Sequence, residues 1–262
     1  METSGLSNAS SGANPLGGVF LSIIIPAHNE EHRLGGTLEA VLAFLAAQPY
    51  TAEVLVVENG SADRTAEVAE SFVPRFGRLR VIREVRRGKG LAVRRGMLEA
   101  RGEFRFLCDA DLSMPIEQVN RFLPPAMEGA DVAIGSREAE GSEVVDSFVR
   151  RWIGRAFNLF VRMLGLTRLR DTQCGFKCFR AAVAQDVFGC QRLDGMAFDA
   201  EVLYIAQRRG WRIVEVPITW RIDTDSRVRL FQDSLGMGKD LLAIRWNGWR
   251  GYYDGRGQAP AR

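Results

Sequence analysis

The chain of 262 residues has few of the features that mark membrane-spanning or secreted proteins. No apolar run reaches the roughly 18 residues that a bilayer span requires, and no apolar signal segment follows Met1. The four cysteines form no Cys-x-x-Cys pair, which favours reduced thiols over a disulfide framework. We therefore expect a cytoplasmic protein without a membrane-spanning helix.

Two glycine-rich phosphate motifs are also absent. No Gly-x-Gly-x-x-Gly follows the first apolar run, and Gly-x-x-x-x-Gly-Lys-Ser/Thr does not occur, so neither a Rossmann dinucleotide site nor a P-loop is predicted. Lysine is scarce as well: of the 35 basic residues, 3 are lysine and 32 are arginine. Genomic base composition is the main reason we see for this bias. Arginine is nevertheless the better side chain for two-pronged binding of phosphate.

The composition, 46% apolar and 26% charged, is that of a folded domain. The net charge of +3 hides an uneven distribution, because residues 1–136 carry 14 basic and 17 acidic side chains and residues 137–262 carry 21 and 15. We expect an anionic small-molecule or lipid partner at the second half, and no nucleic-acid partner.

Strand-like and helix-like segments alternate along the first 134 residues. Alternation at this spacing predicts an α/β fold with a doubly wound, mostly parallel sheet. The predicted strands are residues 20–26, 53–57, 79–82, 104–107 and 131–134, and the predicted helices are 31–47, 62–72 and 90–100. The stretch 211–220 adds a later strand.

Each of four predicted strands runs into a polar cluster at its carboxyl end. In open parallel sheets ligands bind at that edge, so the four clusters predict one site. They are residues 27–30, 58–61, 88–90 and 109–111. In the last of them, Asp109 and Asp111 are two carboxylates one residue apart, and their hard oxygens suit Mg²⁺ or Mn²⁺.

Further motifs follow these clusters in order along the chain. Together the stretches are residues 25–31, 57–63, 87–90 with 96–97, 109–111, 135–137, 150–158, 171–177 and 198–201. They resemble the motifs of inverting family-2 glycosyltransferases with a GT-A fold, and those of the second half are similar to polyprenyl-phosphate sugar transferases. Residues 174–177 and 218–245 look closer to the dolichyl-phosphate β-glucosyltransferases than to the mannosyl-phosphate synthases. The resemblance covers roughly residues 22–250.

The resemblance implies a nucleotide-sugar donor site. Metal and donor diphosphate would be held by Asp109 and Asp111, with Mg²⁺ or Mn²⁺ as the cofactor. The residues implied in donor binding are Pro26, Ala27, Asn29, Glu30, Glu58, Asp63, Lys89, Asp109, Ala110 and Asp111. Glu58 and Asn59 stand where relatives commonly have Asp, which leaves the fit around the base, and so the donor, open.

A phosphate acceptor needs charge compensation rather than a general base, because a phosphate monoester is largely a dianion at pH 7. The resemblance implies Arg137 and Arg151 as the acceptor-binding and catalytic arginines, with Lys177 and Arg221 as weaker candidates. If the acceptor were instead an alcohol, Asp199 and Glu201 would be the candidate bases.

Two stretches of the second half have an interfacial character. Residues 144–166, placed on a helix, put arginines in a narrow stripe beside a wide apolar arc, and residues 241–253 end in tryptophans and tyrosines with arginines between them. Such patterns suit a helix lying on an anionic membrane, but also a helix that packs on the core. We expect a disordered tail over 1–18, one domain over 19–250 whose part near 137–180 faces acceptor and membrane, and a flexible end over 251–262.

The sequence therefore predicts a glycosyltransferase that moves a hexose to a polyprenyl phosphate with inversion, peripheral on the cytoplasmic face of the membrane. Glucose from UDP-glucose is the favoured donor sugar. Three alternatives stay open: the same transfer from GDP-mannose, transfer to a soluble hydroxyl acceptor, and a binding module without turnover.

Overall fold

The computed structural model describes residues 18–145, 148–221 and 230–254, and it describes side chains for all of these except residues 145–153, 221 and 230–235. The predicted tails, residues 1–18 and 251–262, lie mostly outside this part of the chain.

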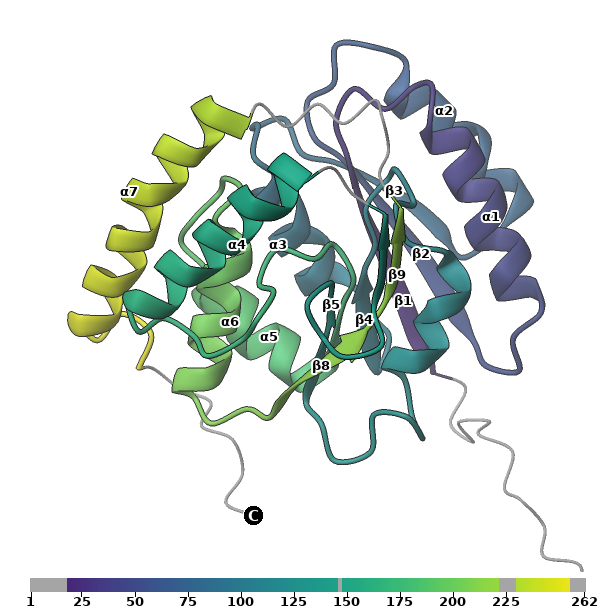
Figure 1. Ribbon diagram of the computed structural model, residues 1–262. Coiled ribbons are helices and arrows are strands. Elements are labelled where there is room, and N and C mark those ends of the chain that lie inside the picture. Colours follow the sequence, from purple (N-terminus) through teal and green to yellow (C-terminus); the bar gives the residue numbers. More distant parts are fainter. Residues whose placement is uncertain (1–17, 146–147, 222–229, 255–262) are drawn as a thin grey trace, which may run out of the picture.

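A seven-stranded sheet forms the centre of the molecule (Figure 1). Its strands are parallel except for β7, which runs antiparallel to both of its neighbours. In spatial order they are β3 (Leu79–Arg83), β2 (Ala52–Glu58), β1 (Leu21–Ala27), β4 (Phe104–Leu107), β7 (Lys177–Arg180), β5 (Val132–Ser136) and β8 (Ile213–Pro217). The prediction of an α/β fold with a mostly parallel sheet is thus confirmed.

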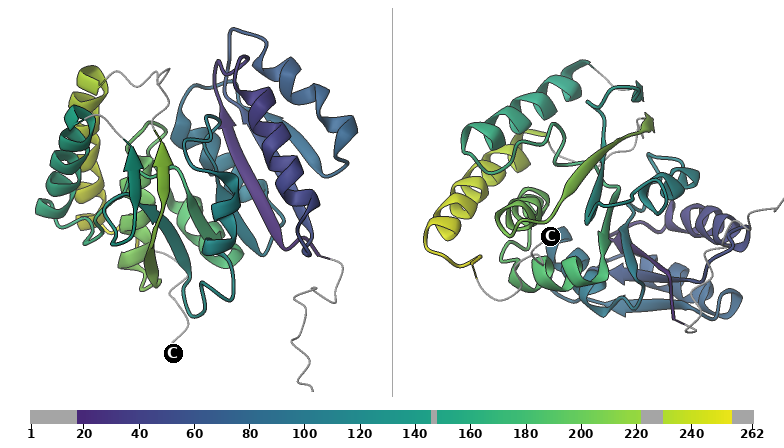
Figure 2. Two further views of the ribbon diagram at one scale, coloured as in Figure 1. Left: turned by 45° about the vertical axis from the view of Figure 1, so that its right-hand side comes forward. Right: turned by 90° about the horizontal axis from the view of Figure 1, so that it is seen from below.

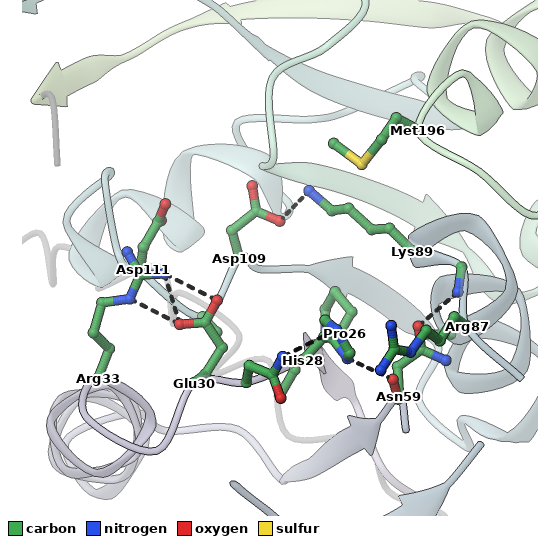
Figure 3. A pocket seen from close by; sticks show the side chains of 15 residues that line it. Pro26, His28, Glu30, Arg33, Asn59, Arg87, Lys89, Asp109, Asp111 and Met196 are labelled. Atoms are coloured by element: carbon green, nitrogen blue, oxygen red, sulfur yellow. Dashed lines mark hydrogen bonds and ion pairs between the residues drawn. The ribbon is translucent and has the colours of Figure 1, made fainter. Parts of the chain in front are cut away.

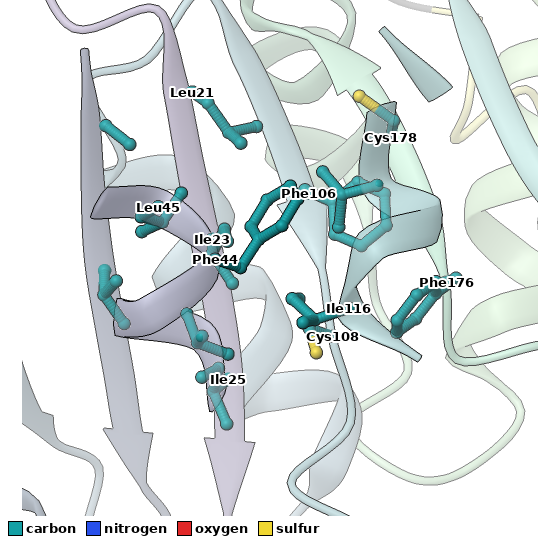
Figure 4. Close-up of a cluster of buried hydrophobic side chains, with 14 of the residues drawn as sticks. Leu21, Ile23, Ile25, Phe44, Leu45, Phe106, Cys108, Ile116, Phe176 and Cys178 are labelled. Atoms are coloured by element: carbon teal, nitrogen blue, oxygen red, sulfur yellow. The ribbon is translucent and has the colours of Figure 1, made fainter. Parts of the chain in front are cut away.

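The central strands are buried on both faces, which explains their continuous apolar sequence. Along β1, Leu21, Ile23 and Ile25 point into one core cluster and Ile24 into the other, because successive side chains of a strand alternate between faces. The first cluster continues into helix α1 (Leu34–Ala46) through Phe44 and into β4 (Figure 4).

Helices cover both faces of the sheet (Figures 1 and 2). The short 3-10 helix η2 packs with α1 and α2 on one face, while α3, α5 and α6 pack on the other. Helices α4 and α7 lie next to each other on the outside of that second layer. The bounds are α1 Leu34–Ala46, α2 Thr65–Ser71, η1 Val73–Arg75, α3 Lys89–Glu99, η2 Ile116–Phe122, α4 Phe148–Met163, α5 Ala181–Cys190, α6 Phe198–Arg208 and α7 Leu230–Trp249.

Two features of the sheet differ from the sequence prediction. Strand β7 was not predicted, because four residues that begin with a lysine carry no strand-like alternation. The predicted strand 211–220 is two strands: β8 extends the large sheet, and β9 (Thr219–Arg221) leaves it to pair with β6 (Glu143–Val145) in a separate two-stranded sheet. Ile218 lies between them and is buried in the first core cluster.

Candidate active site

A cavity of about 570 Å³ opens at the carboxyl edge of the sheet, where the sequence predicts a site. Its walls come from the ends of β1, β2 and β4, from the loop that enters α3, and from the loop before α6 (Figure 3). The lining residues are Pro26, Ala27, His28, Asn29, Glu30, Arg33, Asn59, Arg87, Gly88, Lys89, Ala92, Asp109, Ala110, Asp111 and Met196.

Lys89 reaches across the cavity to Asp109. Its Nζ lies 2.7 Å from Asp109 Oδ1, and about a quarter of each side chain is exposed. Lys89 is the first residue of α3, and the turn before it requires a glycine at position 88. Gly88 has a φ of +151°, and a Cβ at this position would overlap the carbonyl oxygen of Asp194. The backbone thus fixes where the lysine side chain starts.

The two carboxyl groups of the Asp-Ala-Asp segment differ in their titration. Burial by itself would raise the pKa of Asp109, but the charges of Lys89, Lys177 and Arg137 outweigh burial and hold its pKa below the ordinary value. The pKa of Asp111 is raised, first by burial and then by the negative charge of Asp109. Of the two, Asp111 is therefore the carboxylate whose ionised form is disfavoured by its surroundings.

This pair fits a divalent cation. Both groups supply hard oxygen ligands, and a cation beside Asp111 would relieve the repulsion that raises its pKa. Within the described ranges no cluster of three or more His, Cys, Asp and Glu side chains is found. The protein would thus give two carboxylates, as Mg²⁺ sites that also use substrate phosphates commonly do.

Gly175 makes room for Asp109. A Cβ at position 175 would overlap Oδ2 and Cγ of Asp109, so the loop before β7 packs directly against the carboxyl group. The sequence marked this glycine as part of a motif, but its contact with Asp109 depends on β7 lying beside β4.

The loop after β1 forms another wall of the cavity. Glu30 and Arg33 form a two-pronged ion pair, with Arg33 Nε 2.8 Å from Glu30 Oε2 and Nη2 2.9 Å from Oε1. Asn29 has a φ of +56°, a left-handed conformation that asparagine tolerates, and its Oδ1 accepts a hydrogen bond from the Ala62 backbone N–H.

The Asn59 side chain joins the end of β2 to the segment that leads into α3. Its Nδ2 donates to the carbonyl oxygens of Arg86 (2.6 Å) and Glu84 (3.4 Å), and its Oδ1 accepts from Gly88 N–H (2.8 Å). An aspartate could accept but not donate these bonds. The residue thus positions the turn that leads to Lys89.

Two predicted donor residues do not line the cavity. Glu58 is 7% exposed and accepts the Ser61 backbone N–H at 2.5 Å, which closes the turn after β2. Asp63 accepts the backbone N–H groups of Glu31 and Thr65, and so joins the loop after β1 to the start of α2. Both support the loops of the site from behind, because each side chain accepts hydrogen bonds from backbone N–H groups of those loops.

Lys177 lies beneath the site. Its side chain is fully buried, and Nζ donates to Asp199 Oδ1 and to the Cys174 carbonyl oxygen, both at 2.5 Å. As part of β7 it cannot offer its ammonium to an acceptor in the state described. It acts on Asp109 through its charge instead.

Arg137 follows β5 and is ion-paired. Its Nε and Nη2 donate to the two oxygens of Asp171 at 2.7 and 2.9 Å, and Asp171 is 1% exposed. Burial opposes ionisation of Asp171, but Arg137 outweighs it and keeps the pKa of Asp171 low. The side chains of Arg151, in α4, and Arg221, at the end of β9, lie outside the described residues.

The two candidate general bases do not reach the cavity. Asp199 is held by Lys177, and Glu201 is fully buried and accepts hydrogen bonds from the Tyr253 hydroxyl (2.6 Å) and the Leu193 backbone N–H (2.8 Å). The structure thus gives no support to a hydroxyl acceptor activated by either of them.

Residues 22–188 match the family model described as glycosyl transferase family 2. The chain belongs to this family. Dolichyl-phosphate beta-glucosyltransferase from Dictyostelium discoideum is 33% identical over 252 residues, which are 89% of this chain and 76% of the relative. The protein of the same name from Homo sapiens is 36% identical over 241 residues, 86% of this chain and 74% of that one.

Solved structures show the same fold. Glucosyl-3-phosphoglycerate synthase from Mycobacterium tuberculosis in complex with UDP has a TM-score of 0.65 at 19% identity, covering 88% of this chain and 80% of that one. Its complex with Mn²⁺, UDP and phosphoglyceric acid has a TM-score of 0.63 at 19% identity, covering 87% and 77%. The predicted GT-A fold of the family is confirmed.

Four lining residues are absent from the predicted strand-end clusters and from the predicted donor residues. Arg33, Ala92 and Met196 lie away from the clusters, and Arg87 immediately precedes one of them. Arg33 stands three residues after Glu30 in the turn that precedes α1, and the ion pair depends on the conformation of this turn. Met196 carries no comparable signal, because only the packing of α6 against α3 places it there.

Proposed function

We propose that the protein transfers glucose from UDP-glucose to the phosphate of a polyprenyl phosphate such as dolichyl phosphate, with inversion at the anomeric carbon. The observation that carries this proposal is the cavity at the sheet edge, where Lys89, Asp109 and Asp111 meet. The named relatives, which match over most of the chain, supply the donor sugar and the acceptor.

The reaction breaks the bond between the anomeric carbon and the β-phosphate oxygen of the donor. It forms a bond from that carbon to an acceptor phosphate oxygen, and UDP leaves with the electron pair. When bound, Mg²⁺ or Mn²⁺ neutralises charge on the departing diphosphate. In this scheme Asp109 and Asp111 hold the cation, Lys89 adds a positive charge, and Pro26, Ala27, Asn29, Glu30 and Ala110 shape the donor pocket.

No proton needs to be removed from the acceptor, because its phosphate is largely a dianion near pH 7. This agrees with the burial of Asp199 and Glu201 away from the cavity. We assign the acceptor phosphate to the side of the site next to Arg137, with Arg151 and Arg221 as further cationic candidates.

A lipid acceptor brings the protein to a membrane surface, and the α4–α7 flank is suited to that contact. We use this name for the exposed apolar side chains of the two outer helices and the turn after α7, namely Leu159, Phe160, Met163, Leu242, Trp246, Trp249 and Tyr252. They make up seven of the nine large apolar side chains that are well exposed in the described part of the chain, so the exposure is concentrated rather than scattered.

Arginines border this flank. Arg250 lies over the rings of Trp246 and Tyr252 at 5.7 and 5.8 Å, and Arg192 lies 4.1 Å from the centre of the Tyr252 ring. Aromatic rings with cations beside them suit the headgroup zone of a bilayer. Among the described residues no helix has the length and hydropathy of a membrane span. We propose peripheral contact on the cytoplasmic face, in keeping with four cysteines that are all free.

The test is a transfer assay with labelled UDP-glucose or GDP-mannose, a polyprenyl phosphate in detergent, and Mn²⁺. We expect label to enter the lipid fraction from UDP-glucose and to remain in water when EDTA is added. Label from GDP-mannose instead would identify a mannosyltransferase. Transfer to 3-phosphoglycerate without lipid would contradict the lipid acceptor.

A further inference from the structure

The ammonium group of Lys89 takes up a carboxylate oxygen that a metal ion could use. Nζ lies 2.7 Å from Asp109 Oδ1, at the wall of the cavity. Within the described residues Asp109 is its one ion-pair partner. A cation that binds to this oxygen must therefore displace the ammonium or share the oxygen with it.

The second lysine of the site is held very differently. Lys177 is fully buried, and both Asp199 and the Cys174 carbonyl fix its ammonium. Lys89 has 28% of its side chain exposed and starts from the first turn of a helix, with four rotatable bonds between backbone and charge. Lys177 is a fixed charge, whereas Lys89 can move within the cavity.

Moving Lys89 alone is unfavourable. If a divalent cation took its place on Asp109, the ammonium would lose its ion-pair partner and face a double positive charge in a partly buried cavity. A nucleoside diphosphate in the same cavity would offer Lys89 a new anionic partner within reach. The cost of freeing Asp109 is then offset by the diphosphate.

We propose that Lys89 exchanges Asp109 for the donor diphosphate, and that this exchange couples cation binding to nucleotide binding. The inference rests on the proposed function for its ligand class, a divalent cation with a nucleoside diphosphate. Each ligand then strengthens the other by the same factor, as thermodynamic linkage requires. The cation alone binds weakly, since it competes with Lys89.

The test is calorimetric titration with Mn²⁺ alone, on the full chain and on Lys89→Met. We expect Mn²⁺ to bind the variant about tenfold more tightly, within the usual range of coupling between sites. UDP alone should bind the variant more weakly, and the gain in UDP affinity on adding Mn²⁺ should shrink by a similar factor. If the variant binds Mn²⁺ alone no more tightly than the wild type, the exchange is refuted.

Two variants control the result. Lys239→Met removes an exposed lysine of α7 and should leave Mn²⁺ affinity unchanged, whereas a gain there would attribute the effect to net charge. Lys89→Arg keeps the charge and should keep the weak Mn²⁺ binding, and tight binding there would refute competition by charge. Because no sugar or lipid is present, a failed glucose transfer leaves this result standing, and the reverse also holds.

Discussion

At the sheet edge, charged side chains are buried and paired, whereas on the α4–α7 flank large apolar side chains face solvent. Lys177 is fully buried with two partners, and Asp171 is 1% exposed beneath Arg137. Trp249, by contrast, is 75% exposed, and Met163 is equally so. Charged residues are usually exposed and large apolar residues are usually buried, and each region reverses one of these two tendencies.

The difference indicates two kinds of partner. Buried, paired charges form a rigid electrostatic frame that suits a small, highly charged ligand such as a diphosphate with its cation. Exposed apolar groups gain free energy when a large apolar phase covers them. Variants that alter one region and leave the other intact test whether the two are separate in function.

The largest effect is expected at Asp111. Asp111→Asn should lower glucose transfer about a thousandfold, since a cation bound there stabilises the leaving group by several kcal/mol. The fold should survive, which a transfer assay and thermal melting can show together. Transfer at the wild-type rate would remove Asp111 from the metal site.

The same variant tests whether burying the Asp111 carboxylate destabilises the fold. Because the pKa of Asp111 is raised in the folded protein, its ionised form destabilises the fold at neutral pH. Asp111→Asn should therefore melt at a higher temperature than the wild type at pH 7. The difference should fade as the pH falls below the ordinary carboxyl range, where the wild type takes up the proton. A variant that melts lower at pH 7 would contradict the cause we give for the raised pKa.

Gly175→Ala should have the next largest effect. The new Cβ would displace the Asp109 carboxyl group, and a shift of about an ångström at a catalytic group can cost roughly a hundredfold in rate. We expect kcat/KM to fall by about that factor and Mn²⁺ to bind more weakly. Gly36→Ala, in α1 with nothing within 4 Å of its Cβ, is the matched control and should be neutral.

Arg137 is paired with Asp171 in the sheet-edge region, and its role can be isolated. Removing it alone would leave Asp171 buried and unpaired, so we compare Arg137→Met/Asp171→Asn with Asp171→Asn. The double variant should raise the KM for the polyprenyl phosphate about tenfold with UDP binding unchanged, a size typical of one charge-assisted contact. If the single variant has the same effect, the loop around Asp171 and not Arg137 binds the acceptor.

The smallest effect is expected on the flank. Trp246→Ser/Trp249→Ser should weaken binding to vesicles of anionic phospholipid by about tenfold or more, because covering a large apolar side chain contributes roughly 1.5–3 kcal/mol. UDP binding should not change. Val73→Ser, an exposed apolar side chain on η1, is the control. If the tryptophan variant and the wild type bind vesicles equally well, the α4–α7 flank is not the membrane-binding surface.

The sequence by itself determined the sheet edge. Apolar runs such as Leu21–Ala27 suit buried parallel strands, and the polar residues after them meet at one edge because parallel strands end on the same side. The sequence therefore suffices to predict Asp109, Asp111 and Lys89 in one site. The order of their motifs along the chain also indicates the glycosyltransferase family.

The tertiary structure alone decided which predicted residues reach the cavity. Glu58, Asp63 and Lys177 are polar residues of the right motifs, but other groups of the fold, some nearby in the chain and some distant, take up their side chains. A sequence does not show which polar groups satisfy one another. It also decided that the apolar arc of α4 faces outward at Leu159 and Met163, since periodicity marks an apolar face without saying what covers it. Hydrogen-bond partners and burial are properties of the assembled fold.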